Sequence, residues 1–190
     1  MPLRCYTCNG NHTCRECPVE KKISGHMRKI IGDYMEKHVA NTVECPKCNC
    51  KSLYVLGNNS PSLDLKCRKC SEIKIECKSK CLSVKMLPND LILNHGSFID
   101  YKSRQEEGLH FVIVIYKIDR IRKELTIRKI LFIDDSYIKK NDNFTVKKKC
   151  GTSLSNIFIR DHTRLPILTS CGAKTFSYKK YFEKIVKEVL

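Results

Sequence analysis

Apolar residues recur at helical spacing in the first part of the chain. Over residues 20–39 they are separated by three or four positions and form one stripe. The stripe consists of Ile23, Met27, Ile30, Ile31, Tyr34, Met35 and His38. Lysines and arginines occupy the other side of this segment. The pattern therefore predicts an amphipathic helix whose stripe packs against a core.

Three short strands are expected after this helix. Their runs of β-favouring residues cover positions 52–56, 63–66 and 73–80. The segment from Gly57 to Pro61 is made of turn-forming residues and separates the first two strands.

Two longer strands follow at residues 110–118 (HFVIVIYKI) and 125–133 (LTIRKILFI). The first is almost continuously apolar, which is typical of a central strand covered on both faces. Residues 96–108 are polar and predict a loop or a short helix, and residues 139–151 are basic and predict an exposed hairpin or loop. Residues 178–190 predict a C-terminal amphipathic helix.

Two cysteine pairs have the spacing of a four-thiolate zinc site. The pattern is C-x2-C-x18-C-x2-C, and its members are Cys45, Cys48, Cys67 and Cys70. Two tight turns of this kind each offer two sulfurs to one tetrahedral ion. We expect a zinc ribbon over residues 45–70 whose ion is structural, because four protein ligands leave no open position.

The first eighteen residues carry a second cysteine-rich motif, C-x2-C-x3-H-x4-C. Its members are Cys5, Cys8, His12 and Cys17. The motif resembles the zinc knuckle of nucleocapsid-type proteins, with Tyr6 after the first cysteine, and this predicts a second structural zinc ion. The spacing between Cys8 and His12 is one residue short, and Cys14 is an extra cysteine. The fourth ligand is therefore either His12 or Cys14.

Acidic and basic residues flank the second cysteine pair. If the chain folds back about that turn, Asp64 lies opposite residue 75 or 76, on a strand about 4.8 Å away. Glu76 and Lys78 share one face of their strand. Two neighbouring carboxylates suit a hard divalent cation such as Mg²⁺, and the lysine could orient water or hold a phosphate. The opposite face of this strand is expected to turn toward a core, through Ile73, Ile75 and Cys77.

The run Pro61-Ser-Leu-Asp64, followed after eleven residues by Glu76-x-Lys78, resembles the PD-(D/E)xK nucleases, the restriction-endonuclease-like superfamily. This resemblance implies an α+β or α/β fold with helices flanking a mixed sheet, into which the zinc ribbon is inserted. It implies Asp64 and Glu76 as ligands of a catalytic Mg²⁺ and Lys78 as the catalytic lysine. Members often carry an acid on a preceding helix, for which Glu36 fits best and Asp33 next. The chain departs from the pattern in its distant proline and in the zinc turn within the hairpin.

The net charge of the chain indicates the kind of molecule that it binds. The chain has 36 Lys and Arg against 20 Asp and Glu, a formal charge of +16. Bound zinc thiolates would lower it by about three charges. The remaining excess favours a polyanion, most simply DNA or RNA.

No run of eighteen apolar residues and no signal peptide is present in the sequence. We therefore expect no membrane association and no secretion, with a location in the nucleus, the cytoplasm or a virion interior. The Lys-, Ile- and Asn-rich composition suits an AT-rich genome, such as that of a large DNA virus.

Two domains are expected, a finger over residues 1–18 and a nuclease-like core over residues 19–190. Two alternatives to a nuclease stay open. Glu76 and Lys78 could belong to the solvated face of a zinc-ribbon strand, in a non-catalytic zinc-finger protein that binds DNA or RNA during packaging or transcription. The third reading is a zinc-held protein–protein adaptor.

Overall fold

The computed structural model describes residues 25–57, 63–70, 73–81, 91–97, 108–119, 122, 124–140, 144–148, 154–159, 165–168 and 175–177. The predicted N-terminal finger, with Cys5, Cys8, His12, Cys14 and Cys17, lies outside these residues, as does the helix predicted at 178–190. Among the described helices, none is long and apolar enough to cross a membrane.

Helix α1 (Gly25–Thr42) confirms the predicted helix and continues past its expected end. Val39 and the residue after the helix, Val43, are both buried, and the Val43 N–H donates to the Val39 carbonyl (3.0 Å), which favours the extra turn. In the last turn, Thr42 Oγ1 donates a hydrogen bond to the His38 carbonyl (2.6 Å). His38 itself is buried, and this burial lowers the pKa of its imidazole.

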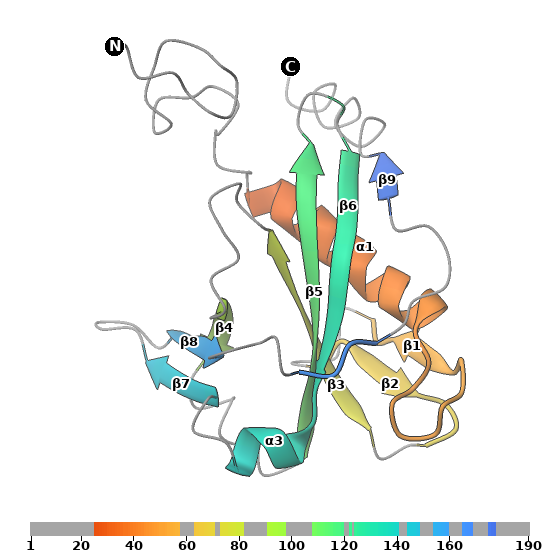
Figure 1. Cartoon of the computed structure of the whole chain (residues 1–190), viewed down its shortest axis with the longest axis vertical. Helices are drawn as coiled ribbons and strands as arrows, with labels where there is room; N and C mark the ends of the chain where they lie inside the picture. The colour runs from red at the N-terminus through yellow and green to blue at the C-terminus, as the bar shows by residue number, and fades with distance from the viewer. Residues whose placement is uncertain are drawn as a thin grey trace.

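Six strands form a mixed sheet in the order β1-β2-β3-β5-β6-β9 (Figure 1). They are β1 (Leu53–Val55), β2 (Leu65–Cys67), β3 (Lys74–Cys81), β5 (Leu109–Asp119), β6 (Glu124–Ile133) and β9 (Thr175–Ser177). Strands β3 and β5 run parallel, and the other neighbouring pairs are antiparallel. The predicted α+β fold with a mixed sheet is confirmed, and β9 is an addition to it.

A second, antiparallel sheet has the order β4-β8-β7. Its strands are β4 (Leu91–Ser97), β8 (Leu154–Ile159) and β7 (Phe144–Lys148), and a short helix, α3 (Asp135–Lys140), precedes β7. The connection between the parallel strands β3 and β5 therefore runs through the other sheet. The prediction missed β4 and β8. Strand β7 lies within residues 139–151, which were predicted to form an exposed hairpin or loop, but its partner β8 lies beyond that range.

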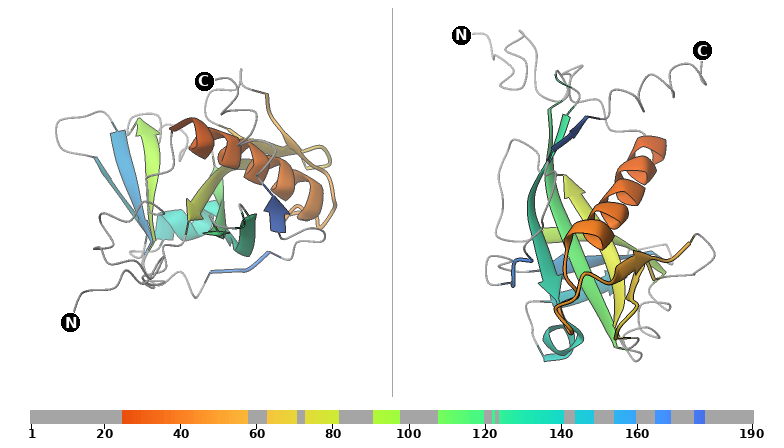
Figure 2. Two further views of the ribbon diagram at one scale, coloured as in Figure 1. Left: turned by 90° about the horizontal axis from the view of Figure 1, so that it is seen from above. Right: turned by 90° about the vertical axis from the view of Figure 1, so that its right-hand side faces the viewer.

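Strand β5 separates two hydrophobic clusters, as its continuous apolar run predicted. On one face, Val112 and Val114 pack in a cluster that includes the buried side of α1. On the other face, Phe111 and Ile113 pack with Ile157 of β8. Helix α1 and the small sheet therefore cover opposite faces of the long strands, and Figure 2 shows α1 lying along them.

This arrangement predicts unequal costs for the same truncation at two isoleucines. Ile113 is fully buried in β5, whereas Ile167 is 59% exposed. We expect Ile113→Ala to lower the free energy of unfolding by about 2–5 kcal/mol, because it leaves a cavity. Ile167→Ala should cost less than about 1 kcal/mol. Urea unfolding measures both, and equal losses would contradict the assignment of β5 to the core.

Candidate active site

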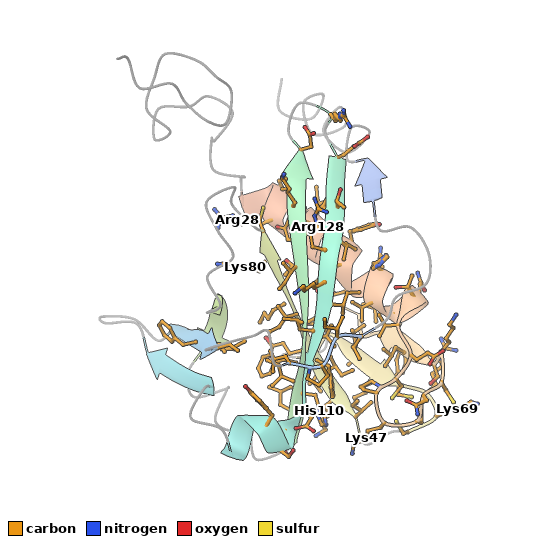
Figure 3. The ribbon with its side chains drawn as sticks, in the orientation of Figure 1. Arg28, Lys47, Lys69, Lys80, His110 and Arg128 are labelled. Atoms are coloured by element: carbon orange, nitrogen blue, oxygen red, sulfur yellow. The ribbon has the colours of Figure 1, made fainter. Side chains whose placement is uncertain are left out.

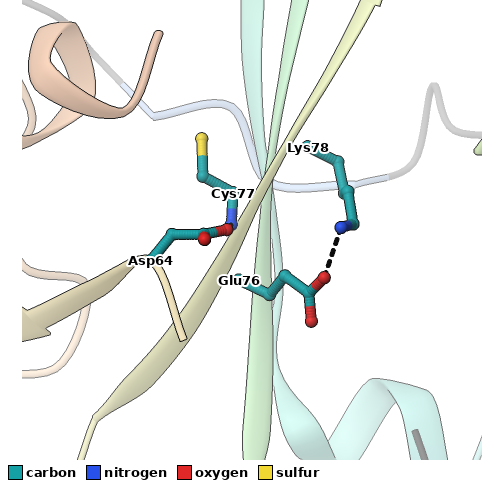
Figure 4. Close-up of polar contacts among 4 residues, drawn as sticks. All are labelled: Asp64, Glu76, Cys77 and Lys78. Carbon is teal, nitrogen blue, oxygen red and sulfur yellow. Dashed lines mark hydrogen bonds and ion pairs between the residues drawn. The ribbon is translucent and has the colours of Figure 1, made fainter. Parts of the chain in front are cut away.

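Asp64 lies where β2 stops pairing with β3. Within the pair, Leu65 is opposite Ile75. One position earlier, the Asp64 N–H donates to the Ile75 carbonyl (3.1 Å), and Asp64 Oδ2 accepts the N–H of Cys77 (2.7 Å; Figure 4). The chain thus holds Asp64 by two bonds to β3, on either side of Glu76, in agreement with the register expected from the sequence.

Glu76 and Lys78 share one face of β3, and the Lys78 ammonium contacts Glu76 Oε1 (Figure 4). Glu76 is only 5% exposed, and its pairing partner on β5, Phe111, packs in the cluster that includes Ile157 of β8. A carboxylate removed from water in this way requires a compensating charge, which Lys78 supplies. The alternative that Glu76 belongs to a solvated strand face is therefore wrong.

The other face of β3 turns toward a core, as predicted, and α1 contributes to that core. Ile73, Ile75 and Cys77 are all buried in the cluster that includes the helix. Burial raises the pKa of the Cys77 thiol, and the charges of Asp64 and Glu36 raise it further. The chain therefore gathers these two acids around the residue that separates Glu76 from Lys78.

Glu36 is a half-buried acid on α1. Burial raises its pKa to about 7, and the negative charges of Asp64 and Asp33 contribute, while Lys78 acts in the opposite direction. Glu36 thus lies within electrostatic reach of both Asp64 and Lys78. Asp33 is exposed on the same helix. The structure brings Asp64, Glu76 and Lys78 to one region, as the sequence predicted. Glu36 lies close enough to this region for the charges of Asp64 and Lys78 to act on it.

A compact cluster of ligand atoms occurs elsewhere in the described residues. Every pair of sulfurs in it lies within 4.8 Å, and its members are Cys45, Cys48, Cys67 and Cys70. The Sγ atoms are 3.3 Å apart between Cys45 and Cys70, and 3.6 Å apart between Cys48 and Cys67. These separations are too long for a disulfide and close to the ~3.8 Å edges of a tetrahedral zinc–thiolate site. The predicted four-cysteine cluster is present and could hold a metal ion.

Backbone geometry builds the two cysteine turns. In the first, Asn49 adopts a positive φ of 53°, a conformation that asparagine tolerates better than most residues. Its N–H donates to the Cys45 carbonyl (2.8 Å). In the second turn, the N–H groups of Lys69 and Cys70 both donate to Cys67 Sγ at 3.3 Å.

Ser52 is a contributor that the sequence reasoning missed. Its Oγ lies 2.9 Å from Cys67 Sγ and 3.9 Å from Cys48 Sγ. The signal was its place just before β1, whose first residue, Leu53, pairs with Cys67. Cys50, which also follows the first turn, lies outside the four-sulfur cluster and donates instead to the Cys48 carbonyl (3.2 Å).

The four thiols titrate differently because they share one site. Burial opposes ionisation of Cys67, yet hydrogen bonds from the Cys70 N–H and from Ser52 outweigh it and lower the pKa of Cys67 to about 6. Burial and the neighbouring sulfurs, Cys45 first, raise the pKa of Cys70. Anionic sulfurs this close repel one another, and a bound cation would relieve the repulsion.

A model of the Dam-replacing family, DpnI, matches residues 17–167. This range contains α1, Asp64, Glu76, Lys78 and the four-cysteine cluster. The chain belongs to the Dam-replacing family. No curated protein matches it.

The Dam-replacing family is a family of restriction-endonuclease-like nucleases, so the resemblance to PD-(D/E)xK nucleases is confirmed at this level. Membership indicates a nuclease acting on DNA. Residues 1–16, which hold Cys5, Cys8 and His12, lie before the matched range.

The environment of Glu36 predicts a pH-dependent stability. Its pKa rises from 4.5 to about 7 on folding, so its neutral form is favoured in the folded chain. The stabilisation is complete below about pH 4.5 and is lost as the pH rises through 7. We therefore expect Glu36→Gln, which cannot ionise, to gain stability relative to the parent between pH 5 and pH 8.

Urea unfolding at both pH values measures this difference, with Glu44→Gln as the matched control. Glu44 is an exposed acid just after α1 that does not contribute to the raised pKa of Glu36. If the free energies of unfolding of the parent and of Glu36→Gln change in parallel with pH, then burial and the neighbouring charges do not raise the pKa of Glu36.

Proposed function

We propose that this member of the Dam-replacing family is a divalent-metal-dependent endonuclease that hydrolyses phosphodiester bonds of DNA. One observation carries the proposal. Asp64 is fixed to the backbone of β3 at Cys77, between the two β3 residues whose charged side chains, Glu76 and Lys78, are in contact. Two carboxylates and an ammonium on neighbouring segments of the sheet are the groups that metal-assisted hydrolysis requires.

The acids fit a cation because their charges already act on one another. Burial raises the pKa of Glu36 and of the Cys77 thiol; the charge of Asp64 raises both pKa values further, and those of Glu36 and Glu76 also raise the pKa of Cys77. A hard divalent ion prefers carboxylate oxygens and would stabilise the ionised form of such a group. Asp64 and Glu76 would hold the ion, which we expect to be Mg²⁺; when bound, it would polarise the phosphodiester and supply an activated water.

Lys78 is the residue suited to contact the phosphate. Its side chain is 24% exposed, whereas that of Glu76 is 7% exposed. An ammonium in this place can neutralise the charge that develops on the phosphate oxygens and can orient the attacking water. Glu36, with a pKa of about 7 and with the charge of Asp64 acting on it, would exchange a proton with that water or join the ligands once ionised.

We further propose that the four-cysteine cluster holds Zn²⁺ in a structural role. Complete thiolate coordination leaves no position for a substrate. A second zinc ion in a separate finger over residues 1–18, a nuclease-like core over residues 19–190 and a viral source remain predictions from the sequence.

The proposal predicts DNA cleavage that needs Mg²⁺ or Mn²⁺. Plasmid DNA, single-stranded DNA and RNA are incubated with the zinc-loaded protein and either ion, and with Ca²⁺ as the inactive control. Asp64→Asn, Glu76→Gln and Lys78→Gln should each lower the cleavage rate at least about a hundredfold, because each removes a charge that stabilises the transition state.

Lys80→Gln is the matched control, since Lys80 is a half-buried lysine two residues further along β3. It should retain cleavage, and all four variants should keep the zinc content and the circular dichroism of the parent. A cleavage rate in Lys78→Gln equal to that of the parent would contradict the proposed mechanism. DNA binding without cleavage in the parent would favour the non-catalytic binding protein.

Metal analysis tests the zinc assignment. The full-length chain should hold two zinc ions, and Cys70→Ser should hold one and melt about 10 °C lower or more, because a lost structural metal costs several kcal/mol. Cys81→Ser, at a half-buried cysteine outside the cluster, should keep both ions. A full zinc content in Cys70→Ser would contradict the assignment.

A further inference from the structure

The two cysteine turns present a basic surface that neither the nuclease site nor the metal site uses. Each C-x2-C turn has a lysine immediately before its second cysteine, Lys47 in the first and Lys69 in the second. Arg68 precedes Lys69, and all three side chains are exposed. We call Lys47, Arg68 and Lys69 the knuckle tip. Figure 3 shows Lys47 and Lys69 at the same end of the molecule.

The knuckle tip is held more rigidly than a surface loop usually is. The Arg68 N–H donates to the Ser52 carbonyl (2.9 Å), which ties the second turn to the segment before β1. The Arg68 guanidinium lies over the Tyr54 ring, 5.4 Å from its centroid. Stacking of this kind limits the conformers of the side chain, so less entropy is lost when it binds an anion.

Within the described residues, no carboxylate pairs with Arg68 or Lys69; the ion pairs shown join Lys78 to Glu76 and Arg122 to Asp119. The four-cysteine site offers a competing explanation, because a zinc–tetrathiolate centre carries about two negative charges that nearby cations would balance. That explanation does not account for the exposure of all three knuckle-tip side chains. Side chains that face solvent balance a partly buried charge poorly, since water screens them.

Strand β2 links the knuckle tip to the nuclease site. Asp64 precedes the strand, and Cys67, the residue before Arg68, ends it. Three residue steps at about 3.3 Å place the second turn about 10 Å from Asp64. A DNA strand advances about 3.4 Å per nucleotide, so this span covers about three base pairs.

We propose that the knuckle tip binds phosphates of duplex DNA about three base pairs from the bond that is cut. The inference rests on the proposed function in taking DNA as the ligand and in placing the cut beside Asp64. It assigns the cysteine turns a direct contact with the substrate, in addition to holding the fold. Its chemistry is that of Lys and Arg neutralising phosphates, without reading bases.

The test measures binding of a 30-base-pair duplex in Ca²⁺ over a range of salt concentrations, with the full-length zinc-loaded chain. The double variant Arg68→Gln/Lys69→Gln should bind about tenfold more weakly at low salt. Its slope of log K against log salt should be shallower by about two, because two phosphate contacts are lost. The matched control Lys117→Gln/Arg128→Gln removes the same two charges from exposed positions on β5 and β6 and should keep the parent's slope.

Equal slopes for the two double variants would overturn the inference, because they would reflect net charge alone. The inference would also be overturned if Arg68→Gln/Lys69→Gln kept the parent's slope but lost zinc more readily to a competing chelator. That result would mean that these side chains balance the charge of the metal site. The outcome is separate from that of the cleavage test. If the parent cleaves DNA and the Arg68→Gln/Lys69→Gln variant keeps the parent's slope, the nuclease assignment stands and the knuckle-tip contact is wrong. If the variant's slope is shallower but the parent does not cleave DNA, the contact stands and the nuclease assignment is wrong.

Discussion

The unequal pairing of β3 is the constraint on which the site depends. Strand β5 pairs with β3 over eight residues, from Lys74 to Cys81, whereas β2 pairs with it only at Lys74 and Ile75. Beyond Ile75, the edge of β3 that faces β2 needs another hydrogen-bond partner, because buried backbone groups are costly to leave unsatisfied. The Asp64 carboxylate accepts the N–H of Cys77 there. A main-chain requirement thus fixes an acid beside the Glu76–Lys78 pair.

The cysteine turns secure β2, the strand that Asp64 immediately precedes. Strands β1 and β2 have three residues each, and a hairpin of that size is marginal without further support. Four sulfurs drawn together at its far end, with Ser52 bonded to Cys67, would fix the register once a metal binds. Helix α1 covers the face of β3 opposite Glu76, and the charge of Asp64 acts on its Glu36. Metal loss should therefore harm the nuclease site through its geometry.

The sequence was informative where a local pattern determined the structure. The C-x2-C spacing predicted the sulfur cluster, the continuous apolar run predicted β5, and folding about the second turn predicted the Asp64 register. Prediction from the sequence failed where burial depends on segments that are far apart in the chain. Glu76 is buried beside Phe111, which packs with Ile157 and Ile159 of the small sheet, and the residues around Glu76 in the sequence do not predict that sheet. The burial of His38 likewise depends on how α1 packs, and the end of α1 depends on Val39 and Val43.

The central claim is that Asp64 and Glu76 hold one divalent ion at the edge of β3. A crystal structure of the zinc-loaded chain soaked in Mn²⁺, with anomalous data that distinguish the two metals, tests it most directly. The account predicts a manganese peak bonded to carboxylate oxygens of both residues, with Lys78 moved away from Glu76, and zinc at the four cysteines. A zinc peak at the cysteines with no manganese at Asp64, and with the Lys78–Glu76 contact intact, would contradict the account.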